Sequence, residues 1–364
     1  MFDRRLVVNF DWVLLLTVLL LAGIGIVNLY STTVSWSAGT PLYMKQLLWL
    51  GGGVLVALMI CFFDYRHLEH FAVHSYVISV AMLVFVLTMG KTTMGATRWI
   101  NLGFFNLQPS EVIKIAIILL FARIFSKSAG PFGFGFFELW KPALWLLIPV
   151  ALILKQPDLG TAIMVLFIAG TMLLFAGLKR GTAVLLGFVG ISVAVLGWFG
   201  LHDYQRARIR TFLNPEADPL GSGYHIIQSK IAIGSGGFFG KGFLQGTQSQ
   251  LSFLPERHTD FAFSVFAEEW GFTGSLVLLL IYLFLIIWGL YVARRAADRF
   301  GLFLAVGVTA MIFWHIVVNL GMVIGLLPVV GVPLPLFSYG GTSMITTMIG
   351  VGLLMNVSMR RFMF

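Results

Sequence analysis

Charged residues are scarce in this sequence, where they occupy 11% of 364 positions. Soluble globular domains carry about 25% charged residues and are roughly one-half apolar, whereas 59% of this chain is hydrophobic. Runs of about 20 apolar residues, the length of a helix that crosses a bilayer, recur from one end of the chain to the other. The composition excludes an ordinary soluble domain and predicts a single membrane-embedded domain over residues 1–364.

Cysteine is nearly absent as well, and the one cysteine, Cys61, lies in an apolar run. No disulfide framework can form within the chain, and a packed thiol is the expected role. The sequence also lacks metal ligands at the spacing of a zinc site. The stretch GSGGFFGKG fails the phosphate-loop pattern, because Ser235 stands where the first glycine should be and Gly242 where serine or threonine should be. We expect this stretch to pack tightly, with a backbone nest for an anion as the open alternative.

The net charge of +9 does not form a basic stripe interleaved with aromatic residues, which is the pattern typical of nucleic-acid binding. We therefore expect no nucleic-acid partner. Lys and Arg gather instead between apolar runs. Cytoplasmic loops of membrane proteins are enriched in these residues, so the basic clusters indicate the orientation of the helices.

About ten apolar stretches are long enough to span the membrane as helices. They are 12–30, 44–63, 72–90, 111–126, 142–156, 159–178, 183–201, 262–293, 302–327 and 341–358. An even number places both termini on one side, and the basic short loops on that side make it cytoplasmic. The segment between helices 7 and 8, about 202–261, then faces outward and lies on the membrane interface. The sequence thus predicts an all-α polytopic membrane protein with one large extracytoplasmic loop.

The segment LPVVGVPLPLFSYGGTS, residues 327–343, precedes the last expected span and contains three prolines and three glycines. We expect irregular backbone there. Such backbone is tolerated at membrane depth only where protein or water covers it.

Four ionisable residues fall within five positions at the start of the eighth expected span: Glu256, Arg257, His258 and Asp260. Asp260 or Thr259 could simply cap the helix. The company of the other ionisable residues favours a functional site, because such groups are costly at membrane depth. Burial and Glu256 would raise the pKa of Asp260 toward neutrality, which suits a general base, whereas Arg257 would lower it.

Two pairs of opposite charge lie at the ends of other spans. Glu111 and Lys114, in QPSEVIKIA, are three residues apart and share one helix face. They either neutralise their own burial or form a charged wall of a substrate cavity. Lys155 and Asp158, in KQPDLGT, could pair with each other, bind an anion or bind a metal.

Arginine alternates in HDYQRARIR, at Arg206, Arg208 and Arg210, just outside the seventh span. These side chains could reach lipid phosphate or bind a phosphate or diphosphate through paired N–H groups. Glu268 and Glu269 lie inside the eighth span. There we favour a structural role, buried, paired or at the interface, over a chemical one.

These stretches together resemble the SEDS family of cell-wall polymerases. The block 223–271, which contains GTQSQLSFLPERHTDF, is the longest and most specific, and KQPDLGTA, QPSEVIKIA and LPVVGVPLPLFSYGGTS agree with it. The likeness covers nearly the whole chain and is greater to the elongation member than to the division member. It implies a peptidoglycan glycosyltransferase of the bacterial inner membrane. Such an enzyme polymerises lipid II, a disaccharide-peptide on undecaprenyl pyrophosphate, through β-1,4 bonds.

The resemblance also implies roles for single residues. Asp260 matches the essential aspartate of the family, which deprotonates the incoming hydroxyl or holds a divalent cation, Mg or Mn. The pairs Glu111–Lys114 and Lys155–Asp158 match motifs of the central cavity. Further candidates for contact with the substrate lie on the outward side: Arg206, Arg208, Arg210, Lys241, Glu256, Arg257 and His258.

The partners that the resemblance implies are lipid II, a class B penicillin-binding protein that acts as transpeptidase, the elongation machinery and membrane lipids; no organic cofactor is implied. Two other functions stay open. A lipid II flippase would use charged pairs and a proline-broken segment, and a scaffold would only recruit the transpeptidase.

Overall fold

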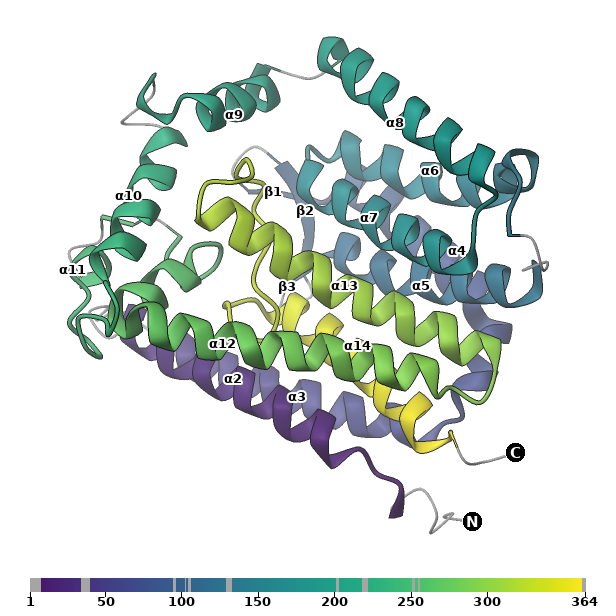
Figure 1. Ribbon diagram of the computed structural model, residues 1–364, viewed down its shortest axis with the longest axis horizontal. Coiled ribbons are helices and arrows are strands. Elements are labelled where there is room, and N and C mark those ends of the chain that lie inside the picture. Colours follow the sequence, from purple (N-terminus) through teal and green to yellow (C-terminus); the bar gives the residue numbers. More distant parts are fainter. Residues whose placement is uncertain are drawn as a thin grey trace.

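The computed structural model describes residues 8–33, 40–93, 96–101, 103, 106–128, 133–200, 203–217, 222–250, 253–254 and 256–361. Long helices dominate this part of the chain (Figure 1). They are α2 (Trp12–Thr33), α3 (Leu42–Phe62), α4 (Tyr65–Met89), α5 (Pro109–Ser128), α6 (Trp140–Lys155), α7 (Leu159–Ala176), α8 (Arg180–Gly200), α12 (Ala262–Arg294), α13 (Arg299–Val323) and α14 (Gly341–Met359). The predicted all-α multi-pass architecture is confirmed.

Nine helices in the described ranges are long and apolar enough to cross a membrane, when the 3-10 turn η1 (Phe136–Leu139) is counted with α6. The helix α5 corresponds to the fourth expected span, 111–126, and brings the number of spans to ten, but it carries Glu111, Lys114, Arg123 and Lys127. Its polar groups are tolerable because α5 packs between α4, α7 and α13. A charged helix in this position provides polar side chains inside the bundle rather than a surface for lipid.

The helices α13 and α14 form the centre of the bundle, and most of their residues are buried. The helix α14 lies against α3, and the approach is close: a Cβ on Gly352 would lie 2.8 Å from the Cα atom of Ala57. Small residues permit such contacts between membrane helices. The helix α8 is the opposite case, because it lies at the edge of the bundle (Figure 1) and Thr182 is the one buried residue among those of α8 whose burial the structure describes.

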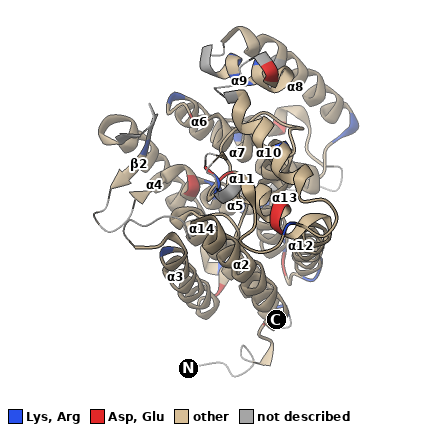
Figure 2. Cartoon of the chain, turned by 90° about the vertical axis from the view of Figure 1, so that its left-hand side faces the viewer, with Lys and Arg blue, Asp and Glu red and all other residues tan. Residues whose placement is uncertain are grey.

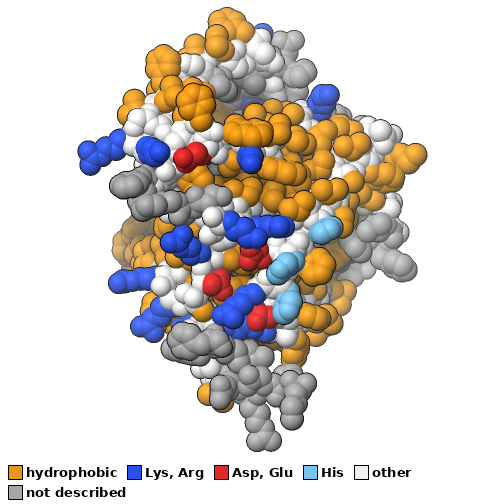
Figure 3. Space-filling view, turned by 90° about the vertical axis from the view of Figure 1, so that its right-hand side faces the viewer, with side chains coloured by type: hydrophobic (Ala, Val, Ile, Leu, Met, Phe, Trp, Pro, Cys, Tyr) orange, Lys and Arg blue, Asp and Glu red, His pale blue; other side chains and the backbone are white. Residues whose placement is uncertain are grey.

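Both termini lie at the same end of the bundle, and α12 begins at the opposite end (Figure 1). Figure 3 shows the end that carries the termini, where basic, acidic and histidine side chains gather. The ion pairs at this end include Arg66–Asp298 at 3.2 Å and Lys127–Glu69 at 2.9 Å. The common end of the termini agrees with the even number of spans, while the side of the membrane stays a prediction.

A small antiparallel sheet lies between α4 and α5, where the sequence analysis predicts no regular element. Its strands are β1 (Lys91–Thr93), β2 (Ala96–Asn101) and β3 (Asn106–Leu107), in the order β1-β2-β3. The segment is rich in threonine and aromatic residues, which fit a pleated surface. The search for long apolar runs missed it because none of the strands is longer than six residues.

The described residues between α8 and α12 also contain short helices where the sequence suggested a loop. They are α9 (Asp203–Leu213), the turn η2 (Pro215–Ala217), α10 (Ser222–Ser235) and α11 (Thr247–Gln250). The helix α10 is fastened to the bundle by Ser229, whose hydroxyl lies 2.8 Å from that of Ser264 and donates to the carbonyl oxygen of Val323 at 2.6 Å. Figure 1 shows α9 and α10 leading from α8 to the start of α12.

The glycine-rich stretch 234–242 packs against a break in α12. At Gly271 the backbone adopts φ 63°, which favours glycine. A Cβ on Gly240 would lie 2.1 Å from the carbonyl oxygen of Glu269, and the backbone N–H groups of Lys241 and Gly242 donate to the carbonyls of Glu268 and Glu269 at 3.0 Å. The glycines therefore permit close packing of two backbones, as expected.

Candidate functional site

A polar cavity of about 430 Å³ lies at the end of the bundle where α12 begins. Figure 2 looks onto this end and shows that charged residues make up only short stretches of a mostly uncharged chain. Side chains from many elements meet in its wall. They are Arg98, Trp99, Gln108, Glu111, Lys114, Thr161, Met164, Arg208, Glu256, Thr259, Asp260, His315, Tyr339, Thr342 and Ser343, together with residues 330–333 and 340–341. The structure thus brings together five of the candidates: Glu111, Lys114, Arg208, Glu256 and Asp260.

Asp260 lies in the cavity wall and does not cap the helix that follows it. The N-cap position of α12 is Phe261, and no side chain caps it. Thr259, the other candidate cap, donates instead to the carboxylate of Glu256 at 3.0 Å. Among the described residues, the carboxylate of Asp260 has no hydrogen-bond or ion-pair partner. The alternative of a helix cap is therefore wrong, and the carboxylate remains available to a ligand in the cavity.

The surroundings of Asp260 suit a proton acceptor. Burial, with a smaller effect of the Glu256 carboxylate, raises the pKa of Asp260 to about 6, although the guanidinium of Arg208 acts in the opposite direction. The counteracting charge is that of Arg208 and not that of Arg257, which is nearer in the sequence. A pKa close to the operating pH is the condition under which a general base is effective.

The position of Asp260 is fixed through its backbone by Asn319 of α13. The side-chain amide of this fully buried asparagine donates to the carbonyl oxygens of Asp260, at 2.9 Å, and Val332, at 2.8 Å. One amide thus joins α13, the start of α12 and the proline-rich segment. Asn319 is not among the residues predicted from the sequence, although an asparagine four residues after His315 in an apolar helix is a polar signal at membrane depth.

The segment between α13 and α14 is irregular, as expected, and protein covers it. Val332, Leu334, Leu336 and Phe337 are buried. The backbone N–H of Tyr339 donates to the carbonyl of His258 at 2.9 Å, which holds the segment against the charged cluster. This is the protein-covered setting in which irregular backbone is tolerated at membrane depth.

Leucine has a similar volume to asparagine but no amide. Replacing Asn319 by leucine is expected to slow the glycosyl transfer that the family resemblance implies by about tenfold or more. Two carbonyl groups lose their donor, and a small displacement of a catalytic group is costly. The measurement compares initial rates and thermal unfolding of the purified variant with the wild type. A variant with normal rates would show that Asn319 does not hold Asp260 in place.

Glu111 and Lys114 form the expected contact on one face of α5, with 2.7 Å between Lys114 Nζ and Glu111 Oε1. The structure adds His315 of α13, whose Nε2 lies 2.8 Å from the same Nζ atom. All three residues line the cavity. Sequence reasoning missed His315 because its partner is about 200 positions away, and only its isolation in an apolar helix could have indicated it.

Lys155 and Asp158 do not form the pair that the sequence suggested. Lys155 is exposed, whereas Asp158 is buried and caps α7 by accepting from Thr161, at 2.9 Å from its hydroxyl. The cation near Asp158 is Arg98 of β2, at 3.9 Å. Lys155 is the last residue of α6 and Asp158 is the N-cap of α7, so the two side chains need not share a face. Arg98 also lines the cavity and is the basic residue that sequence reasoning overlooked.

Most of the other basic candidates lie outside the cavity wall. Arg206 donates to the carbonyls of Trp198 and Phe199, at 3.2 and 2.8 Å, where cations suit the end of helix α8. Arg210 is exposed. Lys241 pairs at 2.6 Å with the buried Glu268. Of the three alternating arginines, therefore, only Arg208 reaches the cavity.

Arg257 and His258 flank the cavity without lining it. Arg257 is buried. His258 Nε2 lies 4.0 Å from the carboxylate of Glu256. Burial lowers the pKa of His258, against the opposing charge of Glu256. The neutral form of this ring is therefore favoured, and its contribution to binding a negatively charged ligand is reduced.

The adjacent carboxylates of Glu268 and Glu269 are both buried and have structural partners. Glu268 accepts from Lys241, Thr247 and the backbone N–H of Gln248, and Glu269 accepts from the hydroxyl of Ser31. These contacts join α12 to α2, to α11 and to Lys241 in the stretch before α11, as the structural interpretation of this pair requires.

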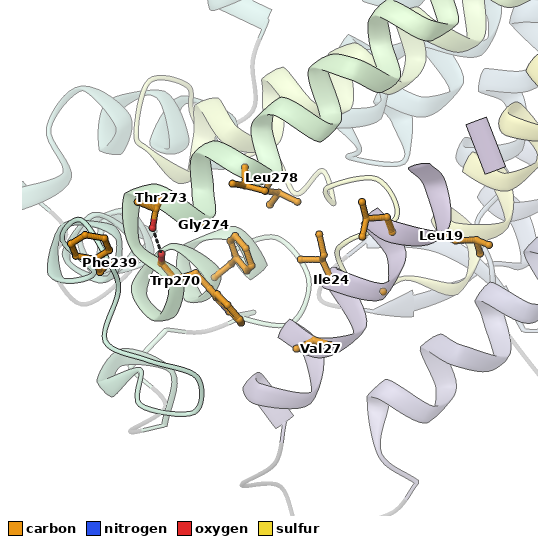
Figure 4. Close-up of a pocket in the computed structure, with 12 residues that line it drawn as sticks. Leu19, Ile24, Val27, Phe239, Trp270, Thr273, Gly274 and Leu278 are labelled. Atoms are coloured by element: carbon orange, nitrogen blue, oxygen red, sulfur yellow. Dashed lines mark hydrogen bonds between the residues drawn. The ribbon is translucent and has the colours of Figure 1, made fainter. Parts of the chain in front are cut away.

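A second cavity, of about 730 Å³, lies between α2 and α12. Figure 4 shows its wall, which includes Leu19, Ile24, Val27, Trp270 and Leu278. Its lining carries no ionisable side chain, so this cavity offers apolar contact and no acid–base chemistry.

The chain is similar over nearly its whole length to bacterial cell-wall proteins. The family model described as "Cell cycle protein", for FtsW, RodA and SpoVE, matches residues 11–362. "Peptidoglycan glycosyltransferase MrdB" of Escherichia coli K12 is 45% identical over 340 residues, which cover 92% of this chain and 91% of that protein. "Peptidoglycan glycosyltransferase RodA" of Treponema pallidum is 36% identical over 434 residues, which cover 98% and 99%.

Solved structures agree with these matches. A chain from the structure described as "Structural coordination of polymerization and crosslinking by a peptidoglycan synthase complex" has a TM-score of 0.81 and 36% identity, and the match covers 98% of this chain and 99% of that chain. The rod shape determining protein RodA of Thermus thermophilus has a TM-score of 0.73 and 32% identity, with 98% of each chain covered.

Proposed function

Because this chain belongs to the FtsW/RodA/SpoVE family, we propose that it is a peptidoglycan glycosyltransferase that polymerises lipid II into glycan strands during cell elongation. Relatives that match it over nine-tenths of its length carry the name peptidoglycan glycosyltransferase. The observation that carries the proposal is the cavity in which Asp260, without a partner of its own among the described residues, faces the cations Lys114, Arg98 and Arg208. The names of the relatives do not favour the flippase alternative.

The reaction needs a base and a place for a leaving diphosphate. The C4 hydroxyl of the acceptor sugar gives its proton to the Asp260 carboxylate, and its oxygen forms the new bond to the anomeric carbon of the donor. The bond from that carbon to the diphosphate breaks, and undecaprenyl pyrophosphate leaves with the electron pair. A single displacement inverts the anomeric carbon, from the α-linked diphosphate to a β-1,4 bond.

The negative charge that develops on the departing diphosphate requires positive groups held in place beforehand. Lys114, Arg98 and Arg208 are the Lys and Arg side chains in the cavity wall. Arginine suits diphosphate because its planar N–H groups bind two oxygens at once.

A divalent cation fits this site only together with the substrate. No three His, Cys, Asp or Glu side chains in the described part of the chain are placed to hold a metal. Magnesium is commonly held by one or two carboxylates plus substrate phosphates, and Asp260 and Glu256 would be those carboxylates here. A cation so bound would neutralise diphosphate charge.

The orientation and the partner complete the proposal. The chain is a multi-pass protein of the bacterial inner membrane. The end with Asp260 faces outward and the end with both termini faces the cytoplasm, as the distribution of Lys and Arg predicts. A solved relative belongs to a synthase complex that coordinates polymerization and crosslinking. We therefore assign a class B penicillin-binding protein as partner, within the elongation machinery.

The direct test is polymerisation of lipid II by the purified protein with the partner transpeptidase, in membranes of defined lipid. Glycan strands longer than the disaccharide are the expected product, with release of undecaprenyl pyrophosphate. Movement of lipid II across liposome membranes without polymer formation would instead support the flippase. A protein with neither activity would support the scaffold function.

The rate is expected to rise with pH as Asp260 loses its proton, with a midpoint near its pKa of about 6. The basic form accepts the proton, so activity is lost as the pH falls below that value. Glu256→Gln removes a negative charge that raises this pKa, so the acidic limb is expected to move to lower pH. The pH–rate profiles of the wild type and Glu256→Gln check both points. An acidic limb at the same pH in both proteins would show that Asp260 is not the group whose titration controls the rate.

A further inference from the structure

His315 of α13 is a buried histidine in contact with the cavity lysine. Its exposed fraction is 5%, and Lys114 of α5 is 1% exposed. The Nε2 atom of His315 lies 2.8 Å from Lys114 Nζ, and Glu111 Oε1 lies 2.7 Å from the same Nζ atom. The lysine ammonium is therefore held between two side chains from two helices.

A third contact fixes the direction of the hydrogen bonds. His315 Nδ1 lies 2.7 Å from the carbonyl oxygen of Met311. A carbonyl oxygen only accepts, so Nδ1 carries the proton. A proton on Nε2 as well would place an N–H against the lysine ammonium. The ring is therefore neutral, and Nε2 accepts one N–H of Lys114.

Lys114 donates to one charged acceptor, Glu111, and one neutral acceptor, His315, and can still donate to a negatively charged ligand. The ammonium has three N–H groups, of which two go to Glu111 and His315, and the third has no partner among the described residues. Glu111 already balances one positive charge. A second carboxylate in place of His315 would make the group negative and repel a diphosphate, whereas a neutral ring accepts without adding charge.

We propose that His315 is a positioning residue, which holds the Lys114 ammonium so that its third N–H donates to the diphosphate of the lipid-linked substrate and product. This inference rests on the proposed function and deepens it, because it assigns the diphosphate to the α5–α13 wall of the cavity. His315 itself acts through Lys114.

The test compares His315→Leu, which removes the acceptor, with His315→Gln, whose side-chain oxygen replaces it. His74→Leu, at an exposed histidine of α4, is the matched control. For each variant, kcat and KM for lipid II, thermal unfolding and the inhibition constant of undecaprenyl pyrophosphate are measured. His315→Leu is expected to weaken product inhibition by about tenfold and to lower kcat/KM by a similar factor, because a hydrogen bond to a charged group is lost. His315→Gln is expected to stay within about threefold of the wild type.

Unchanged product inhibition in a stably folded His315→Leu protein would overturn the inference, as would equal losses in the Leu and Gln variants. If His315→Leu does not fold, His315→Glu replaces it in the comparison, because Glu and Gln share a shape and differ in charge. Equal binding of undecaprenyl pyrophosphate by these two would also overturn it. Failure of the proposed function is seen separately, as a wild-type protein that binds undecaprenyl pyrophosphate but makes no polymer.

Discussion

Asp260→Asn is expected to lower the rate of lipid II polymerisation by about 10²–10⁴-fold, the usual contribution of a general base. The amide keeps the size of the side chain but cannot accept the proton at neutral pH. No capping bond is lost, since the carboxylate does not cap α12, and the backbone carbonyl of Asp260 keeps its bond from Asn319. The fold should therefore survive, and single-turnover rates with partner bound are the measurement.

The matched control for Asp260→Asn is Glu216→Gln. Glu216 is exposed in η2, in the same segment between α8 and α12, and does not line the cavity. This change also turns a carboxylate into an amide, yet it should leave polymerisation unchanged. Equal activity of the wild type and Asp260→Asn, with normal folding and partner binding, would exclude Asp260 as the base and direct attention to Glu256.

Lys114→Ala is expected to lower the free energy of unfolding by about 3–5 kcal/mol and to abolish activity. Removing one member of a buried ion pair leaves the other charge without compensation, and the side chains of Lys114 and Glu111 are only 1% and 8% exposed. Denaturant unfolding in detergent and polymerisation assays measure the two effects.

The same helix provides the control for Lys114→Ala. Lys127 pairs with Glu69 at 2.9 Å, but its side chain is 58% exposed, so Lys127→Ala should cost no more than about 1 kcal/mol. The double change Glu111→Gln with Lys114→Met removes both buried charges. It should recover much of the stability without the activity. A stable, active Lys114→Ala protein would show that the Glu111–Lys114 pair is needed neither for folding nor for activity.

The arrangement of the bundle could be predicted because its causes are local in sequence. A run of about 20 apolar residues specifies a membrane helix wherever it lies, so most helices begin and end close to the expected positions. The largest difference, at the start of α4, also has a cause that is local in sequence. The helix α4 begins at Tyr65 rather than near 72, because Asp64 caps it by accepting from the backbone N–H of Arg66 and a polar first stretch precedes the apolar run.

Only some of the residues that line the cavity could be predicted, because neighbours along the chain are not always neighbours in space. Glu111 and Lys114 meet because a helix places residues three apart on one face. Lys155 and Asp158 do not meet, since α6 ends at Lys155 and the carboxylate of Asp158 accepts from the backbone N–H of Thr161 in the first turn of α7. Arg206 and Arg208 are two positions apart in α9, yet one binds the end of α8 and the other lines the cavity.

The sequence by itself determined the membrane helices, the shared end of the termini and the irregular proline-rich segment, since each follows from composition or short spacing. The type of chemistry came from the likeness to a known family. Only the tertiary structure decided which charges meet. Lys114 with His315, Asp158 with Arg98, and the backbone of Asp260 with Asn319 are contacts across some 60 to 200 residues. Hydrogen bonds and ion pairs act over a few ångströms, so helix packing had to bring these side chains together first.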